Sequence, residues 1–535
     1  MRARDQLGCW YDDAAFAQAY GLRGRPGISP AQLAMVTVLQ FTENLTDRQA
    51  ADAVRGRLDW KYCLGLALED EGFGYSVLSE FRARLVAGSL ELSIFDLLLL
   101  ERLKALGLVQ AGGRQRTDSS HVLGRVRGMN RLELAGETVR AALEALAAAA
   151  PGWLAGVIDS SWQQVYAQRI ENFRLPGSDT ARRKLAVQYG RDGYHLLEAV
   201  YAPSAPGWAR ELPAVQALRR VWIQQYYRSG EHGEKVEQRE AGEHGIPPGR
   251  VTIVSPYDTD ARYSEKRGNS WLGYKVHLTG TCSDAAGDDP AGRPAAPNLI
   301  TNVATTRAAV ADAAMTEPVH DALRARDLLP GEHAVDAGYT SADLLLAARA
   351  RGITLFGPLL ADNSPQARSG GYTATAFTID WDHQQVTCPQ GAASISWSPC
   401  RQRGTEAIVV RFPASTCQAC PAKSNCTRSS RLGRQLSLRP REIHQAITAA
   451  RAAQDSQQWK HRYAIRAGVE GTIAQATHVT GIRHARYLGL PKTRLEHNAA
   501  ATAINLIRLD AWWTGKPLDR TRTTHLQRLD FSLAT

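Results

Sequence analysis

RQRTDSSHV, residues 114–122, is the stretch that decides the fold, because it predicts a short strand with Asp118 inside it. A strongly helical run, LELAGETVRAALEALAAAA, follows at residues 132–150, and helical patterning continues to about residue 245. Over residues 271–279 apolar and polar side chains alternate, which is typical of a half-buried strand. We therefore expect a long helical insertion between the first strand and the next.

Short strands and helices alternate beyond this point, each bounded by turn and cap signals. Strands are expected at residues 299–303, just before Asp336, and at 353–356. Helices are expected at about 308–326 and from Ser341 to Gly352. This order of elements is that of a mixed α/β sheet with inserted domains.

The charge of the chain points to a polyanionic partner. Its 535 residues carry a formal net charge of +11, with a pI near 9.3, which favours nucleic acid over a membrane. The N-terminus lacks the apolar core of a signal peptide, and no apolar run approaches the ~20 residues that span a bilayer. Eight cysteines in so long a chain do not form a disulfide scaffold. We expect a cytoplasmic protein with reduced thiols and no membrane segment.

Residues 1–110 read as a series of short helices. Ser29-Pro30, Thr46-Asp47 and Ser76 are their start signals. Short helices that carry basic residues such as Arg48 and Arg55 suit a helix-turn-helix-like DNA-binding domain. A helical bundle without DNA contacts is the alternative.

Three acidic residues stand out by their placement. Asp118 lies within the first strand, Asp336 at the exit of a later strand, and Glu470 in a C-terminal helix. Mg²⁺ prefers carboxylate oxygens and keeps several waters, so a few carboxylates and a substrate phosphate suffice to bind it. Two such ions ~3.5–4 Å apart would activate the attacking oxygen and stabilise the leaving one. Singly, each residue could instead shape a turn or lie on a surface.

The helix around Glu470 favours the metal site. Tyr463, Arg466 and Glu470 are spaced by three and four residues, so they share one helical face. Gly468 and Gly471 each cost ~1 kcal/mol of helix propensity relative to alanine. Their presence predicts a close approach of the backbone to the sheet or to DNA. Arginine and tyrosine beside a metal-binding carboxylate are suited to hold a phosphate.

At these residues the chain resembles the insertion-sequence DDE transposases of the eleven-eighty-two group. The matching stretches are TDSSHVLGRVRGMNRLELAGETVRAALEALA, SPYDTDARYSEKRGNSWLGYKVHLTGTC, HAVDAGYTS and YAIRAGVEGTIAQA, which lie between Thr117 and Ala476. The resemblance implies an InsH-like N-terminal domain and a ribonuclease H-like catalytic domain. It also implies that Asp118, Asp336 and Glu470 are the catalytic residues and bind Mg²⁺ or Mn²⁺.

The resemblance extends to the residues around the glutamate. Tyr463-x-x-Arg466-x-x-x-Glu470 matches a tyrosine-arginine-glutamate motif of a wider superfamily. That motif normally continues to a lysine seven positions after the glutamate, where this chain has Thr477. Arg483 and His478 are the candidates to supply the missing phosphate contact.

Basic residues gather in two further segments. One runs from Arg401 to Arg441, and the other includes Arg483 and Arg486. Such patches give salt-dependent affinity with little sequence information, unless they are simply solvated loops. We expect DNA contacts from Tyr463, Arg466, Lys275 and Arg483.

Cysteines cluster in the same region. Cys388-Pro-Gln-Gly, Cys417-x-x-Cys420-Pro and Cys426 resemble zinc knuckles, in which turns with Pro and Gly follow paired thiolates. We expect Cys388, Cys417, Cys420 and Cys426 to hold one structural Zn²⁺. Free thiols are the alternative.

Together these features predict a ribonuclease H-like α/β fold with two insertions. Its expected parts are a helical N-terminal DNA-binding domain (1–110), the first part of the core (111–125), a helical insertion (126–250), the second part of the core (251–361), a cysteine-bearing β-leaning insertion (362–445), C-terminal helices that complete the core (446–515) and a tail (516–535).

The function expected from the resemblance is DNA transposition in a bacterial cell, close to the nucleoid. The enzyme would bind the terminal inverted repeats of its element as a homodimer, cleave there by metal-dependent hydrolysis, and join the 3′-hydroxyl ends to target DNA. Two alternatives are a catalytically inactive, transposase-derived regulator and a site-specific nuclease that cuts without joining.

Overall fold

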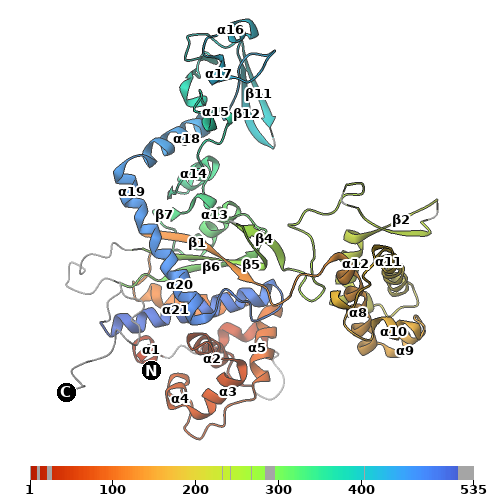
Figure 1. The fold of residues 1–535 in the computed structure, drawn as a ribbon. Coiled ribbons are helices and arrows are strands. Elements are labelled where there is room, and N and C mark those ends of the chain that lie inside the picture. The colour runs from red at the N-terminus through yellow and green to blue at the C-terminus, as the bar shows by residue number, and fades with distance from the viewer. Residues whose placement is uncertain are drawn as a thin grey trace, which may run out of the picture.

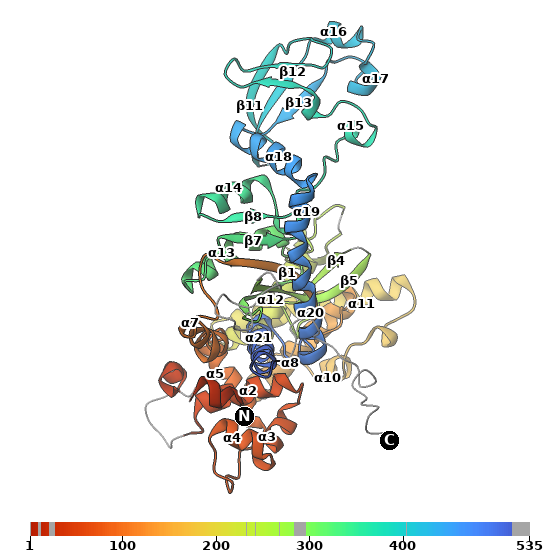
Figure 2. The same ribbon diagram turned by 90° about the vertical axis from the view of Figure 1, so that its left-hand side faces the viewer.

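The computed structural model of the chain describes residues 2–8, 12–20, 27–231, 233–240, 242–266, 268–282, 296–402 and 404–515. The predicted tail at 516–535 lies outside these residues. A central sheet lies between the N-terminal helices on one side and a separate cysteine-bearing region on the other (Figures 1 and 2). No helix in the described part of the chain is long and apolar enough to cross a membrane.

The central sheet is mixed, as the sequence predicts. In the described residues its strands are β1 (Arg114–Leu123), β4 (Arg262–Lys266), β5 (Asn269–Thr281), β6 (Ile300–Arg307), β7 (Glu332–Val335) and β8 (Thr354–Phe356). β1 pairs antiparallel with β5, which pairs antiparallel with β4 and β6 along its other edge. On its second side β1 pairs in parallel with β7, and β7 with β8. The predicted ribonuclease H-like fold is therefore confirmed.

β5 is buried on both faces, so the half-buried strand predicted at 271–279 is wrong in this respect. Tyr274 faces the main hydrophobic core, yet His277 on the opposite face is equally buried. The second face is covered because helix α13 (Thr316–Ala325) lies on that side of the sheet. Its His320 hydrogen-bonds His333 of β7, with 2.8 Å between the two ring nitrogens. Polar residues on that face therefore point into the protein rather than into solvent.

The N-terminal helices begin where the sequence predicts. Ser29 caps α2 by accepting a hydrogen bond from the Gln32 amide, and Thr46 forms a capping box with Gln49. The helices are α1 (Arg2–Leu7), α2 (Pro30–Thr42), α3 (Asp47–Gly56), α4 (Leu58–Leu64), α5 (Ser76–Ala87), α6 (Ser93–Phe95) and α7 (Glu101–Ala105). Of these, α1, α2, α5 and α6 pack on α21 (Leu490–Trp513), which also contacts β6. The N-terminal helices and the sheet therefore share one hydrophobic core.

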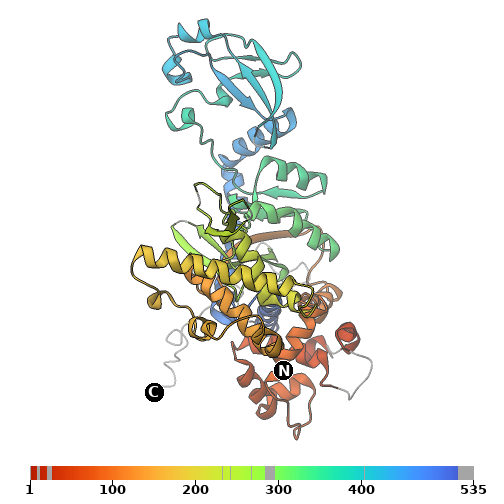
Figure 3. The same cartoon turned by 90° about the vertical axis from the view of Figure 1, so that its right-hand side faces the viewer.

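The helices of the insertion lie together as one group (Figures 1 and 3). They have a hydrophobic core of their own, which includes Trp222 and Tyr226. The elements of the insertion are α8 (Arg131–Ala149), α9 (Pro151–Ala155), α10 (Ser161–Tyr166), α11 (Asp179–Tyr201), α12 (Pro213–Gln225), β2 (Tyr226–Ser229) and β3 (Lys235–Gln238). The predicted continuation of helix to about residue 245 is wrong, because α12 ends at Gln225 and a hairpin follows. Gly230 and Gly233, both with positive φ, supply the turn that reverses the chain.

The cysteine-bearing region stands away from the sheet, beyond α14 (Ala342–Ala350) (Figures 1 and 2). Its elements are α15 (Pro365–Arg368), β9 (Thr378–Asp380), β10 (Gln385–Thr387), β11 (Ser396–Gln402), β12 (Thr405–Arg411), α16 (Ala414–Gln418), α17 (Lys423–Cys426) and β13 (Gln435–Leu438). The chain returns to the sheet through α18 (Arg441–Gln454), α19 (Gln457–Ala464) and α20 (Gly468–Thr480). This confirms the predicted β-leaning insertion followed by C-terminal helices.

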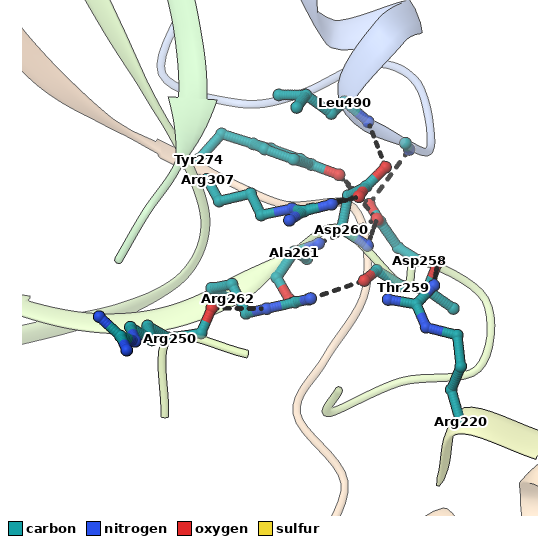
Figure 4. A network of polar contacts seen from close by, with 11 residues as sticks. Arg220, Arg250, Asp258, Thr259, Asp260, Ala261, Arg262, Tyr274, Arg307 and Leu490 are labelled. Carbon is teal, nitrogen blue, oxygen red and sulfur yellow. Dashed lines mark hydrogen bonds and ion pairs between the residues drawn. The ribbon is translucent and has the colours of Figure 1, made fainter. Parts of the chain in front are cut away.

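A polar junction fixes the start of α21 to the sheet (Figure 4). The Asp258 carboxylate accepts hydrogen bonds from the Tyr274 hydroxyl of β5, at 2.6 and 2.7 Å, and from the Gly489 amide at 3.3 Å. Asp260 pairs with Arg307 of β6 at 2.5 Å and accepts from the Leu490 amide. The chain that leaves the helical insertion therefore anchors the C-terminal helix before entering the sheet.

Candidate active site

Asp118 lies in the middle of β1 and faces the C-terminal helices. Its side chain is only 10% exposed, and its Oδ2 lies 2.5 Å from Nη2 of Arg466. The second terminal nitrogen of Arg466, Nη1, lies 2.9 Å from Oε1 of Glu470 in the first turn of α20. One guanidinium therefore bridges the first and third of the predicted acidic residues.

Asp336 directly follows β7, the parallel neighbour of β1, in which Val335 is in register with Thr117. Its Oδ1 accepts a hydrogen bond from the Gly338 amide at 2.8 Å and so begins the 3₁₀ turn Ala337–Tyr339. The Asp336 charge is near enough to raise the pKa of Asp118. The structure thus brings the second predicted carboxylate to the same end of the sheet as the first.

Burial and charge act in opposite directions on Asp118. Burial raises the pKa of the Asp118 carboxyl to about 6, the Arg466 guanidinium opposes this rise, and Asp336 adds to it. For Arg466, burial is the largest single influence and lowers the pKa, but Asp118, Tyr463, Asp336 and Glu470 together outweigh it, so the net pKa is raised. A cation held between these carboxylates is therefore favoured.

The helical segment that carries the site is interrupted just before Glu470. A 3₁₀ turn, Ile465–Ala467, joins α19 to α20, and Arg116 of β1 donates from Nη1 to the Ile465 carbonyl at 2.7 Å. A Cβ atom at Gly468 would overlap the Arg116 guanidinium, which confirms the close approach predicted there. At Gly471 no protein atom lies within 4 Å of such a Cβ, so the protein itself makes no close approach at this position.

The other predicted DNA-binding side chains lie around the site at different depths. Tyr463 is half-buried in α19 and stacks on Trp459, with ring centroids 4.8 Å apart. Arg483 follows α20 and donates from Nε to the Ser120 hydroxyl of β1 at 2.9 Å. Lys275 of β5 donates from Nζ to the Val310 carbonyl at 2.8 Å, and its side chain is 12% exposed. Arg483 therefore contacts β1 two residues from Asp118, whereas the Lys275 side chain is bonded within the protein.

Sequence reasoning missed Asp312, which lies beside the predicted acids. Its Oδ1 lies 3.0 Å from Nζ of Lys275, and its Oδ2 accepts a hydrogen bond from the Ser119 hydroxyl at 3.1 Å. Burial raises the pKa of Asp312. The charge and hydrogen bond of the Lys275 ammonium act in the opposite direction, and the net pKa is lowered. A carboxylate next to Asp336 is thereby kept ionised. Its position in the sequence carries no signal that sets it apart from other aspartates.

The three predicted carboxylates have the chemistry that a hard divalent cation requires. Two come from adjacent strands and one from a helix, so the strands give rigidity and the helix supplies the third ligand. As the side chains stand in the described residues, no three of the His, Cys, Asp and Glu side chains form a group that could hold a metal ion. Arg466 lies between Asp118 and Glu470, so the helix-borne carboxylate would have to leave the guanidinium to join the other two.

The mixed sheet places the chain in the ribonuclease H-like class of folds. A family model described as a transposase DDE domain matches residues 387–510, and one described as a transposase domain (DUF772) matches residues 4–84. No curated protein matches the chain. The two matches support an insertion-sequence DDE transposase, a class of nucleotidyl-transfer enzyme that acts on DNA. The first match includes Glu470 but neither Asp118 nor Asp336.

Proposed function

We propose that this transposase binds the ends of its own insertion sequence, cleaves them by metal-dependent hydrolysis, and joins the freed 3′-hydroxyl ends to target DNA. The observation that carries the proposal is the meeting of Asp118 from β1 with Arg466 and Glu470 from the C-terminal helices, beside Asp336 at the end of β7. Burial makes the Asp118 carboxylate costly to ionise, and a bound cation would offset this cost, so its position suits a ligand in metal-dependent phosphoryl transfer.

Asp118, Asp336 and Glu470 would hold Mg²⁺ or Mn²⁺ in this proposal. Bound there, the metal supplies electrostatic stabilisation of the attacking and leaving oxygens. The side chains of the protein would bind the DNA phosphate and exclude water. Arg466 is placed to turn from the carboxylates to a DNA phosphate, with which a guanidinium forms paired, charge-assisted hydrogen bonds. Burial of the Asp118 face by α20 limits the water that competes for the site.

The residues around the three carboxylates would position the DNA. Arg483 is bonded to β1 two residues beyond Asp118, and Tyr463 lies one helical turn before Arg466. Gly471, with open space around it, would let the DNA backbone approach α20 closely. Lys275 would contribute to binding only after it leaves Asp312 and the Val310 carbonyl. The same proposal includes three further points. The protein binds DNA as a homodimer, it belongs to the eleven-eighty-two group, and its chain divides into the domains predicted from the sequence.

The proposal is tested by strand transfer. Purified protein, a labelled DNA fragment that ends in the terminal inverted repeat found beside the gene, and a supercoiled target plasmid are incubated with Mg²⁺. Joined products are expected only with the correct end sequence. Cleaved but never joined ends would instead support a site-specific nuclease. End binding without cleavage in Mg²⁺ or Mn²⁺ would support an inactive, transposase-derived regulator.

A further inference from the structure

The cysteine-bearing region has little apolar material with which to hold itself together. Its buried hydrophobic cluster consists of Phe377, Val386, Val410, Phe412, Leu436 and Leu438. Three of its strands are only three or four residues long, and its two central helices are α16 and α17, of five and four residues. Regions with so small a core usually need a disulfide, a metal ion or a partner for stability.

Four cysteines of this region line the same cavity. This cavity of about 240 Å³ is lined by the side chains of Cys388, Cys417, Cys420 and Cys426. They come from separate elements, because Cys388 follows β10, Cys417 lies in α16, Cys420 follows α16 and Cys426 ends α17. The thiols are near enough for the other three to act on the pKa of Cys426, which is raised mainly by burial.

Backbone amides point at two of these sulfur atoms. The Ala392 amide donates to Cys388 Sγ at 3.3 Å, across a tight turn in which Gly391 has a positive φ. The Arg434 amide donates to Cys417 Sγ, also at 3.3 Å. Such hydrogen bonds hold each sulfur in a fixed direction, as outer hydrogen bonds do for the ligands of a metal site.

The charge around the cavity is positive. Arg434 lines the cavity and is half-buried, and within the described residues its buried Nε has no hydrogen-bond partner. Lys423 lines it too and donates to Gln418. Four thiolates around Zn²⁺ carry a net charge of −2, which a neighbouring guanidinium and ammonium would offset.

We propose that Cys388, Cys417, Cys420 and Cys426 bind one structural Zn²⁺, which joins the loop after β10 to α16 and α17. The site is four-coordinate and takes no part in phosphoryl transfer. Because the side chains as they stand do not form a coordination group, the thiols rotate about their Cα–Cβ bonds to converge in the cavity. Each thiol that binds releases its proton.

The ion would stiffen the surface that holds the basic residues between Arg401 and Arg441. α16, which carries Cys417, follows β12, and β13 pairs with β12 after Arg434. A zinc ion would therefore fix the segment that joins β12 to β13 against the loop after β10. Its contribution to DNA binding would act through the arrangement of arginines rather than through contact with DNA.

The chain offers a matched control for this proposal. Cys400 lies in the same region, on β11, but is not among the residues that line the cavity. Its partner across the sheet is Ala407 of β12. Cys400→Ser should therefore leave zinc binding unchanged, whereas the double variant Cys417→Ser/Cys420→Ser should abolish it.

The test measures metal in the full chain, purified without chelators and without an affinity tag that binds metal. Elemental analysis should find about one zinc per wild-type chain, the same in Cys400→Ser and in Asp118→Asn, and none in the double variant. Replacement by Co²⁺ should give the visible absorption of a tetrahedral thiolate site. Retention of zinc in Asp118→Asn separates this site from the acidic one, so a failure of the proposed DNA chemistry leaves the zinc result intact.

Two results would overturn the proposal. One is folded wild-type protein that neither contains zinc nor takes it up from added Zn²⁺. The other is a disulfide between any two of the four cysteines in protein purified under reducing conditions, detected by mass spectrometry as two cysteines that are alkylated only after further reduction. Because wild-type metal content decides the first result, poor folding of the double variant would not protect the proposal.

Discussion

The strand side and the helix side of the candidate active site differ in how firmly each holds its carboxylate. Asp118 sits within a paired strand with 10% of its side chain exposed, whereas Glu470 sits in the first turn of a helix with 65% exposed. The same arginine contacts both. A buried carboxylate is fixed in place but costs stability, and an exposed one can move at little cost. The site therefore has one preset ligand and one that can close on metal and DNA.

The largest expected effect is loss of chemistry when either side is neutralised. Asp118→Asn, Asp336→Asn and Glu470→Gln should each reduce end cleavage by more than about 100-fold, because each removes a metal-binding charge without changing side-chain size. End binding, measured by gel shift, should remain. Asp455→Asn, which neutralises an exposed acid after α18, is the control. Near-normal cleavage by any of the first three variants would remove that residue from the site.

Removal of the arginine that joins the two sides should come next. Arg466→Ala loses a charge-assisted phosphate contact and should weaken binding of cleaved ends roughly 10-fold at low salt, with a smaller loss at high salt. Arg466→Lys should restore part of the affinity. Arg462→Ala is the matched control, because Arg462 lies in the same segment but pairs with Glu332, at 2.5 Å. If both alanine variants lose the same affinity for cleaved ends, Arg466 contributes only its positive charge and makes no specific phosphate contact.

The difference in burial also predicts a difference in stability. Burial raises the pKa of Asp118 from 3.8 to about 6, so its folded pKa exceeds its unfolded one. Its ionisation therefore destabilises the folded chain as pH rises through about 6, and this penalty is absent below the unfolded pKa. Without divalent metal, Asp118→Asn should stabilise the protein by roughly 2–3 kcal/mol at pH 8 and by nothing near pH 4.

Glu470→Gln is the comparison variant for this measurement, because its carboxylate is largely exposed. Urea unfolding at the two pH values gives the free energies directly. If Asp118→Asn gains no more stability at pH 8 than Glu470→Gln does, the strand-side carboxylate is not strained by burial.

Local signals in the sequence were enough for several helix starts and for the strands beside Asp118 and Asp336, but not for the hairpin after α12 or for contacts between elements. Ser29, Thr46 and Ser341 each cap the helix predicted to follow them, and Asp118 and Asp336 lie in and after the predicted strands. These signals depend on residues within a few positions of each other. Asp312 could not be found in this way, because only the folding of η5 (Asp312–Met315) against Lys275 and Ser119 gives it a role.

Burial was the harder quantity to predict. The alternation at 271–279 suggested one solvent-facing side, but His277 and Thr279 are buried because a polar face can be covered when its hydrogen bonds are satisfied inside. His277 bonds the Tyr339 hydroxyl at 2.5 Å and Thr279 bonds Thr117 at 2.7 Å. Whether a polar face meets solvent or another layer depends on segments far away in the chain, and no local pattern reports it.

The smallest expected effects are those of replacing the two glycines near Glu470, and the two replacements should differ in their effect on stability. Gly468→Ala places a methyl group against the Arg116 guanidinium, which is itself held by the Ile465 carbonyl, and should cost about 1–3 kcal/mol. Gly471→Ala meets no protein atom and should stabilise α20 by up to about 1 kcal/mol. If DNA approaches α20 at Gly471, the same variant should bind DNA ends less tightly although its fold is more stable. Unchanged end binding by Gly471→Ala would mean that DNA does not reach this turn of the helix, and the second glycine would then have no role in binding.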